Sequence, residues 1–404
     1  MAEHEFDRRR LLRSAAMISA LAAAGSAVGT SAMAAPAVLP GTAGWEALGS
    51  HDDMLRATQL PAETAAKMST DQLVSAVLAY PLMMDALAHN SVQHGFERVA
   101  KGFNGLSELL RRPNAGAVLA RRYAAFDIRV PAGASELAAG QHVWQAGVLE
   151  MLLAQPTVLG TLSRPEREAL LRLGKDKSAA KRAESAAYGE AGLEPTALLL
   201  GRAVAITENW DWRVSSFLRD GIAPSAAVLT EVDEVASAHL ADPAGIHQVT
   251  GGFGTQDSLG TVKTPRGSTV AVHVTSYELT SAQITSYNNY VRQSYPSASR
   301  ETNASRKYNC HSYAWYSTAT TNIRWMDDPG DDKYMTDGSY TPWSAPRPFY
   351  DGMKLTWRSD DHSGINVGQG TYVRSKWGQL PRMYHGATYT PYDDSSRYPY
   401  YRSA

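Results

Sequence analysis

Residues 307–315 have the sequence KYNCHSYAW, which contains Cys310, the only cysteine in the chain of 404 residues. Asn309 is a favourable N-cap residue, and the apolar positions that follow, as far as Ala319, fit an amphipathic helix. The stretch therefore predicts a helix that begins at Cys310 and holds its thiol in the first turn. Free backbone N–H groups at such a turn favour a thiolate and can bind an oxyanion. Because Cys310 has no disulfide partner within the chain, its thiol is either a buried apolar group or a nucleophile.

A cysteine nucleophile needs a base, normally a histidine that is close in the fold rather than in the sequence. His362 is the strongest candidate, because it begins an alternating segment, residues 362–367, that we interpret as a strand. His311 is adjacent to Cys310 but would point about 100° away around a helix, which makes it the poorer base. We therefore expect Cys310 to be the nucleophile and His362 to be the general base.

The residue that orients His362 should lie on the next strand of the predicted hairpin. A two-residue turn at residues 369–370 would place Ser375 on the His362 face, whereas a three-residue turn would place basic residues there. A cation cannot stabilise an imidazolium, so Ser375 is the predicted third catalytic residue. Asn366 and His385 are the alternatives.

The first 34 residues have the pattern of an export signal. Adjacent arginines precede the uncharged run at residues 15–24, and small residues stand at Ala32 and Ala34, where a signal peptidase would read them. The arginine pair resembles a twin-arginine signal, so we expect a protein that is secreted, in the cell wall or in the periplasm. An uncleaved amino-terminal anchor is the alternative. We expect no transmembrane segment in the mature chain.

The composition divides the rest of the chain into two parts. Alanine and leucine at helical spacing predict an all-α domain of about seven short helices in residues 66–242. Tyrosine, tryptophan and glycine become frequent in residues 265–404, where strand and helix patterns predict an α+β domain. We interpret residues 35–65 and 243–264 as linkers. A hydrophobic content of 44% is ordinary for a globular protein, and the formal net charge of −1 argues against a nucleic-acid-binding protein.

The second part, residues 265–404, resembles the papain-like NlpC/P60 and CHAP cell-wall peptidases, and most closely a group of exported bacterial amidase-domain proteins with the motif YNCHSYAW. The resemblance rests on the cysteine at a helix start, the downstream histidine and the sequence SKWG at residues 375–378. It implies a papain-like fold, in which a helix carries the cysteine and an antiparallel sheet carries the histidine. It also implies cleavage of amide bonds in peptidoglycan peptides through a thioester, with Cys310 as the nucleophile and His362 as the base and then the acid. We expect no metal or other cofactor, because Cys310, His311, His362 and His385 do not have the spacing of a zinc site. The chain departs from the usual pattern directly after the cysteine, where His311-Ser312 stands in place of Ser-Gly.

Several further residues and functions remain open at this point. The candidates for substrate binding are Asn309, His311, Asp337, Ser339 and Trp377. Aspartates at 327, 328, 331 and 332 suggest either a calcium loop or a plain acidic turn, and the turn is favoured because no later glutamate follows. The expected partner is peptidoglycan or another cell-wall peptide, and the helical domain would position the wall, bind a protein partner or cover the site. A catalytically silent wall-binding or structural protein and a papain-like acyltransferase are the alternative functions.

Overall fold

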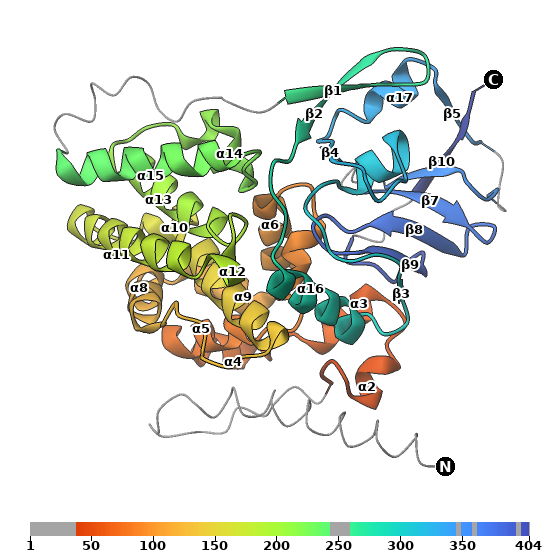
Figure 1. Ribbon diagram of the computed structural model, residues 1–404. Coiled ribbons are helices and arrows are strands. Elements are labelled where there is room, and N and C mark those ends of the chain that lie inside the picture. The colour runs from red at the N-terminus through yellow and green to blue at the C-terminus, as the bar shows by residue number, and fades with distance from the viewer. Residues whose placement is uncertain (1–37, 243–258, 345–348, 358–361, 393–396, 404) are drawn as a thin grey trace.

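The computed structural model describes residues 38–242, 259–344, 349–357, 362–392 and 397–403. A helical region occupies the first part of the chain and a region rich in β-strands follows it (Figure 1), as the composition predicts. The predicted export signal and most of the linker expected at residues 243–264 lie outside these ranges. Within them, no helix has the length and apolar character needed to cross a membrane.

The helical region begins earlier than the sequence suggests. Residues 35–65 are expected to be a linker, but three short helices lie between Ala43 and Lys67. The hydroxyls of Thr42 and Ser50 cap the first two of these helices. Trp45 is fully buried, so this segment is part of the core rather than a solvated connection.

Local capping also explains the helix starts further along. Ser69 and Gln72 form a capping box at the start of α5, and Ser163 and Glu166 form one at the start of α11. The helices of this region, more than the seven expected, have the following bounds: α2 Ala43–Glu46, α3 His51–Ala57, α4 Ala62–Lys67, α5 Thr70–Leu78, η1 Met83–Ala88, α6 Val92–Gly102, α7 Asn104–Arg111, α8 Ala115–Ala125, α9 Glu136–Leu153, α10 Pro156–Leu159, α11 Arg164–Ala183, α12 Ser185–Tyr188, α13 Glu194–Thr207, η2 Trp212–Val214, α14 Ser216–Asp220 and α15 Ala226–Ala241.

The second region contains two antiparallel sheets. The small one has the strand order β1-β2-β4, and the large one has the order β3-β9-β8-β7-β6-β10-β5. The bounds are β1 Leu259–Lys263, β2 Thr269–Val274, α16 Ser281–Ser294, β3 Ser299–Arg300, η4 Ser312–Tyr316, β4 Arg324–Trp325, α17 Asp332–Thr336, β5 Tyr340–Pro342, β6 Lys354–Trp357, β7 Ser363–Val367, β8 Tyr372–Lys376, β9 Arg382–Gly386 and β10 Arg397–Arg402. The strand near residue 270 and the helix from Ser281 agree with their sequence patterns. β1 begins inside the range expected to be a linker.

The hairpin of β7 and β8 has the register of a two-residue turn. Ile365 pairs with Arg374 and Asn366 pairs with Val373. Successive residues of each strand point to opposite faces of the sheet, and in β8 the exposed Tyr372 and Arg374 alternate with the buried Val373 and Ser375.

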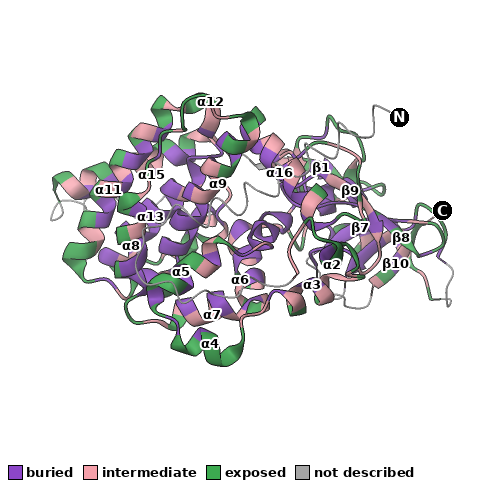
Figure 2. Cartoon of the chain, turned by 90° about the horizontal axis from the view of Figure 1, so that it is seen from below, coloured by how far each residue is buried: buried purple, intermediate pink, exposed green. Residues whose placement is uncertain are grey.

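The two regions share one hydrophobic core. A single cluster of buried side chains joins Leu152 and Leu199 of the helical region with Leu355, Trp357 and Trp377 of the large sheet. Buried residues run from one region into the other in Figure 2. The opposite face of the large sheet and the small sheet enclose a second cluster, which includes Val272, Trp315 and Met326. The chain is therefore not two separate globules joined by a linker.

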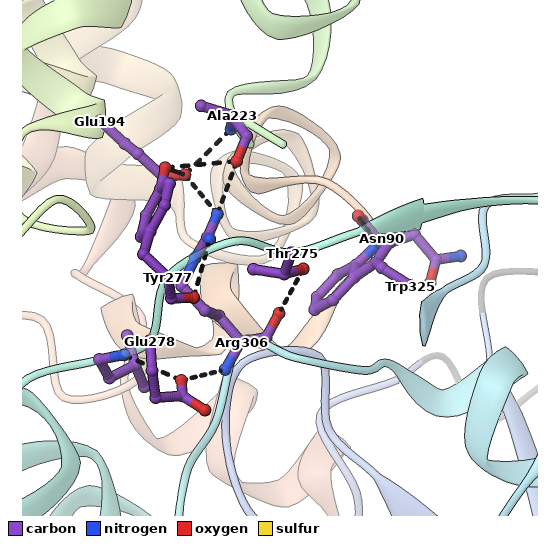
Figure 3. Close-up of polar contacts among 9 residues, drawn as sticks. Asn90, Glu194, Ala223, Thr275, Tyr277, Glu278, Arg306 and Trp325 are labelled. Atoms are coloured by element: carbon purple, nitrogen blue, oxygen red, sulfur yellow. Dashed lines mark hydrogen bonds and ion pairs between the residues drawn. The ribbon is translucent and has the colours of Figure 1, made fainter. Parts of the chain in front are cut away.

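Close backbone contact and a buried ion pair also connect the regions. α16 packs on α9 at Gly140, where a Cβ atom would lie 2.0 Å from the carbonyl oxygen of Ala282. Arg306 donates to Glu194 at 2.5 Å and to the carbonyl of Ala223 at 2.9 Å (Figure 3). Burial raises the pKa of Glu194, and the Arg306 guanidinium opposes that shift.

Candidate active site around Cys310

Cys310 begins a short helix, as its sequence context predicts. Residues 310–316 are helical, and the last five of them form a π-helical turn, which ends at Tyr316 rather than continuing to Ala319. Asn309 fixes the start, because its side-chain oxygen accepts hydrogen bonds from the backbone N–H groups of Ser312 at 3.1 Å and Met326 at 3.2 Å. With only seven helical residues, the dipole of this segment is small. The environment of the thiol therefore depends mainly on its side-chain neighbours.

The histidine that lies beside Cys310 is His311. Its Nδ1 atom is 2.9 Å from the carboxylate of Asp331 and 2.9 Å from the hydroxyl of Ser363. The side chains of Cys310, His311, Asp331 and Ser363 are all fully buried. Burial lowers the pKa of His311, but the interactions with Asp331 and Cys310 outweigh it and hold that pKa well above the ordinary value. The paired imidazole in turn lowers the pKa of Asp331 against the opposing effect of burial.

Asp331 was not a sequence candidate for this role. It lies in the acidic turn that precedes α17, 20 residues after His311 in the sequence. The sequence pattern there suggests a plain turn or a calcium loop. In the described part of the chain, no group of three or more acidic, histidine or cysteine side chains is arranged to hold a metal ion. The turn instead directs one carboxylate onto an imidazole.

His362, the base expected from the sequence, does not meet Cys310. Both of its ring nitrogens are buried and have no hydrogen-bond partner among the residues that the structure describes. Its ring stacks on Tyr392 with centroids 3.5 Å apart and meets the edge of Trp357 at 4.5 Å. Burial, followed by the nearby histidines, lowers the pKa of His362 well below the ordinary value. An apolar aromatic pocket therefore holds this imidazole neutral.

Strand alternation explains the difference between the two histidines. Neighbouring residues on a strand point to opposite faces of a sheet. Ser363, at the start of β7, faces the Cys310 helix, since its hydroxyl accepts from the Trp315 indole at 2.9 Å and contacts His311. His362 precedes it by one residue and lies on the other side, among side chains of the large shared core.

Ser375 and the alternatives for the third residue lie on the face away from Cys310. The Ser375 hydroxyl is 2.8 Å from Nε2 of His385 and accepts from the Trp377 indole at 3.0 Å, so it does not orient His362. Burial lowers the pKa of His385 to about 4. The Asn366 amide donates to backbone carbonyls at 2.9 and 3.3 Å.

The predicted substrate-binding residues differ in their surroundings. Trp377 is buried beneath the sheet, and Asn309 and His311 belong to the Cys310 site itself. Asp337 and Ser339 join the turn before β5 to the β1–β2 hairpin: Asp337 accepts from the Thr264 hydroxyl, and the Ser339 hydroxyl accepts from the backbone N–H of Arg266 at 3.1 Å. These two contacts hold a loop together.

A residue of the helical region completes the site. Asn90, between η1 and α6, places its side-chain nitrogen 2.6 Å from Nε2 of His311. Its side-chain oxygen accepts from the Asn309 amide at 3.0 Å and lies 3.6 Å from the sulfur of Cys310. The Trp325 indole donates to the Asn90 carbonyl at 3.2 Å, next to the Arg306 network in Figure 3. No sequence pattern connects Asn90 with residues some 220 positions away.

The site therefore consists of a buried thiol, an imidazole with a carboxylate behind it, and two side-chain amides. Such a set can activate a thiol and transfer its proton to a leaving group. Comparison of the chain with protein-family models, with curated proteins and with solved structures finds no match.

Proposed function

We propose that the protein is an exported thiol-dependent amidohydrolase that cleaves amide bonds in cell-wall peptides. The observation that carries the proposal is the chain of contacts from Cys310 through His311 to Asp331, in which a buried carboxylate supports the imidazole beside the only thiol. A papain-like arrangement is part of the proposal. It is supported by the Cys310 helix, which packs on β6, β7 and β8 of an antiparallel sheet.

The proposed reaction proceeds through a thioester. The sulfur of Cys310 forms a bond to the substrate carbonyl carbon, and its proton passes to His311. When the carbon–nitrogen bond breaks, His311 returns that proton to the departing amine. Water then attacks the thioester, with His311 as the base, and releases the carboxylic acid and the thiol.

The other residues have supporting roles in this proposal. Asp331 holds Nδ1–H of His311 and stabilises the imidazolium that forms in each step. The Asn309 side-chain nitrogen donates to the Asn90 oxygen, which lies 3.6 Å from the sulfur, and at that position it would donate to the oxyanion. His311 thus replaces His362 as the base, and Asp331 replaces Ser375 as the residue behind it.

Incubation with purified peptidoglycan tests the proposal. The wild-type chain should release new amino groups over a long incubation at high protein concentration, and Cys310→Ala should release none. The Ser305→Ala variant is a control, because it alters a hydroxyl in the same loop that contacts Glu278 and not the thiol. Equal release by wild type and Cys310→Ala would contradict a cysteine mechanism.

A further inference from the structure

The side chain of Asn90 lies in the Cys310 site with a defined orientation. Two backbone N–H groups donate to the oxygen of Asn309, so the other end of that amide must be its nitrogen, a donor. The atom of Asn90 that faces this donor at 3.0 Å is therefore its oxygen. It follows that the nitrogen of Asn90 faces Nε2 of His311, which leaves Nδ1–H to bond Asp331.

This orientation matches what amide hydrolysis requires of a substrate. The sulfur attacks the carbonyl carbon, the carbonyl oxygen must lie near a hydrogen-bond donor, and the leaving nitrogen must lie near the imidazole that will protonate it. The Asn90 oxygen is 3.6 Å from the sulfur of Cys310 and bonded to Asn309, and its nitrogen is 2.6 Å from Nε2 of His311. The amide of Asn90 therefore has its oxygen at the donor and its nitrogen at the imidazole, as a substrate amide would.

The loop that carries Asn90, between η1 and α6, lies against the buried site. Cys310, His311 and Asn309 are each 0% exposed, whereas Asn90 is partly exposed above them. The β-rich region holds the loop in place, because the Trp325 indole donates to the Asn90 carbonyl at 3.2 Å. The backbone N–H of Gln379 also donates to Leu87 at 2.8 Å. Because Asn90 bonds both His311 and Asn309 beside the buried thiol, a substrate amide cannot take the same positions while Asn90 is there.

We propose that the Asn90 carboxamide is an internal pseudo-substrate, which occupies the amide subsite at Cys310 and keeps the enzyme latent until the loop at residues 89–91 is displaced. The inference rests on the proposed function, since it assigns the ligand class, a carboxamide, and the regulation of the same site. With Asn90 in place, its amide occupies the position at Nε2 of His311 through which a proton would pass between the thiol and the imidazole. After displacement, Nε2 is free to exchange a proton with the thiol.

The first measurement is the rate at which methyl methanethiosulfonate, a small thiol reagent without an amide, modifies Cys310 in the full chain. Asn90→Ala should react at least tenfold faster than wild type. Trp325→Phe keeps an aromatic side chain but removes the indole N–H that donates to the loop, and should react at an intermediate rate. Asn114→Ala is the matched control, because it removes an asparagine side chain of the helical region that accepts from the Thr70 hydroxyl rather than contacting the Cys310 site. Wild-type rates in both Asn90→Ala and Trp325→Phe, or equal acceleration in Asn114→Ala, would overturn the proposal.

The second measurement tests the ligand class. Acetamide added to Asn90→Ala should refill the vacated subsite and slow the modification of Cys310, whereas acetone, which lacks the nitrogen that faces His311, should protect much less. Equal protection by both, or none by acetamide, would show that the subsite does not recognise an amide.

Amine release from peptidoglycan separates this inference from the proposed function. Faster, acetamide-sensitive modification of Asn90→Ala without amine release from any variant would support the pseudo-substrate and overturn hydrolysis. Cys310-dependent release by wild type that does not increase in Asn90→Ala would support hydrolysis and overturn latency.

Discussion

Two serines, Ser363 and Ser375, make the same pair of contacts on opposite faces of the large sheet. Each accepts a hydrogen bond from a tryptophan indole, at 2.9 and 3.0 Å, and each contacts a histidine nitrogen, at 2.9 and 2.8 Å. The histidines are His311 and His385, and both are fully buried. Only His311 has a carboxylate behind it, that of Asp331. The pKa of His311 is therefore raised, whereas burial lowers the pKa of His385 to about 4. The carboxylate of Asp331, together with Cys310, therefore separates an imidazole whose pKa is raised from one whose pKa is lowered by burial.

The largest expected effect is the loss of amine release when each of the two histidines is replaced by alanine in turn. His311→Ala should lower the rate of amine release by about 10³-fold, because general base and acid catalysis typically contribute 10²–10⁴-fold. His385→Ala should change the rate less than about threefold at a temperature where it stays folded, because a neutral imidazole on the far face moves no proton. The measurement is initial rate on peptidoglycan, with thermal unfolding of each variant as the control. A greater loss of rate in His385→Ala than in His311→Ala would show that our proposal places the chemistry on the wrong face of the sheet.

The next effect concerns the carboxylate itself. Asp331→Asn should lower the rate on the order of 10²-fold, because the imidazolium loses its partner while the shape of the side chain is kept. It should also change stability with pH. The pKa of His311 is raised above 6.5, so its stabilisation is present below that pH and is lost as pH rises through the folded-state pKa. The pKa of Asp331 is lowered from 3.8, so its stabilisation is present above that pH and is lost on further acidification.

The free energies of unfolding of wild type and Asp331→Asn should therefore differ most between about pH 4 and pH 6.5, and converge at higher pH. Denaturant titrations across this range give the difference directly. A constant difference at all pH values would mean that Asp331 supports the fold without interacting with a charged His311.

These two histidine environments also show how far the sequence could lead. The helix start at Cys310 and the hairpin register were predictable, because capping and alternation are local patterns. His362 was preferred over His311 on the same grounds, but alternation does not say which of two neighbouring residues faces a helix. The 100° separation of helical neighbours did not exclude His311 either, because it and Cys310 both contact the one side chain of Asn90.

The remaining parts of the site depend on tertiary contacts that have no sequence signal. The acidic turn could be recognised, but not the direction in which Asp331 points. Asn90 lies in a different region of the chain, and composition suggested that this region was a separate domain. The helical region and the large sheet instead share one hydrophobic core, and their packing places the loop that carries Asn90 beside Cys310.

A smaller effect distinguishes the two serines. Ser363→Ala and Ser375→Ala should each lower the free energy of unfolding by about 1–3 kcal/mol, because each leaves a buried indole N–H without its acceptor. Their effects on amine release should differ. Ser363→Ala should reduce the rate several-fold, since its hydroxyl helps to position His311, while Ser375→Ala should leave the rate unchanged. Chemical denaturation measures the free energy of unfolding, and initial rates measure amine release. Equal losses of rate in Ser363→Ala and Ser375→Ala would contradict the assignment of the chemistry to the Ser363 face of the sheet.

The smallest effect is the pH dependence of stability due to His362, whose ring nitrogens have no hydrogen-bond partner among the described residues. Its pKa is lowered well below 6.5, so the unfolded chain binds a proton below that pH which the folded chain does not. Wild type should then lose on the order of 1 kcal/mol per pH unit from this residue as pH falls below about 6.5. His362→Phe should reduce the slope and keep the packing against Tyr392, while the other buried histidines continue to contribute. His142→Phe, at a partly buried backbone contact, is the matched control. If the slope in His362→Phe equalled that of wild type, His362 would take up a proton in the folded chain, and only then would it be a rival to His311 as the base.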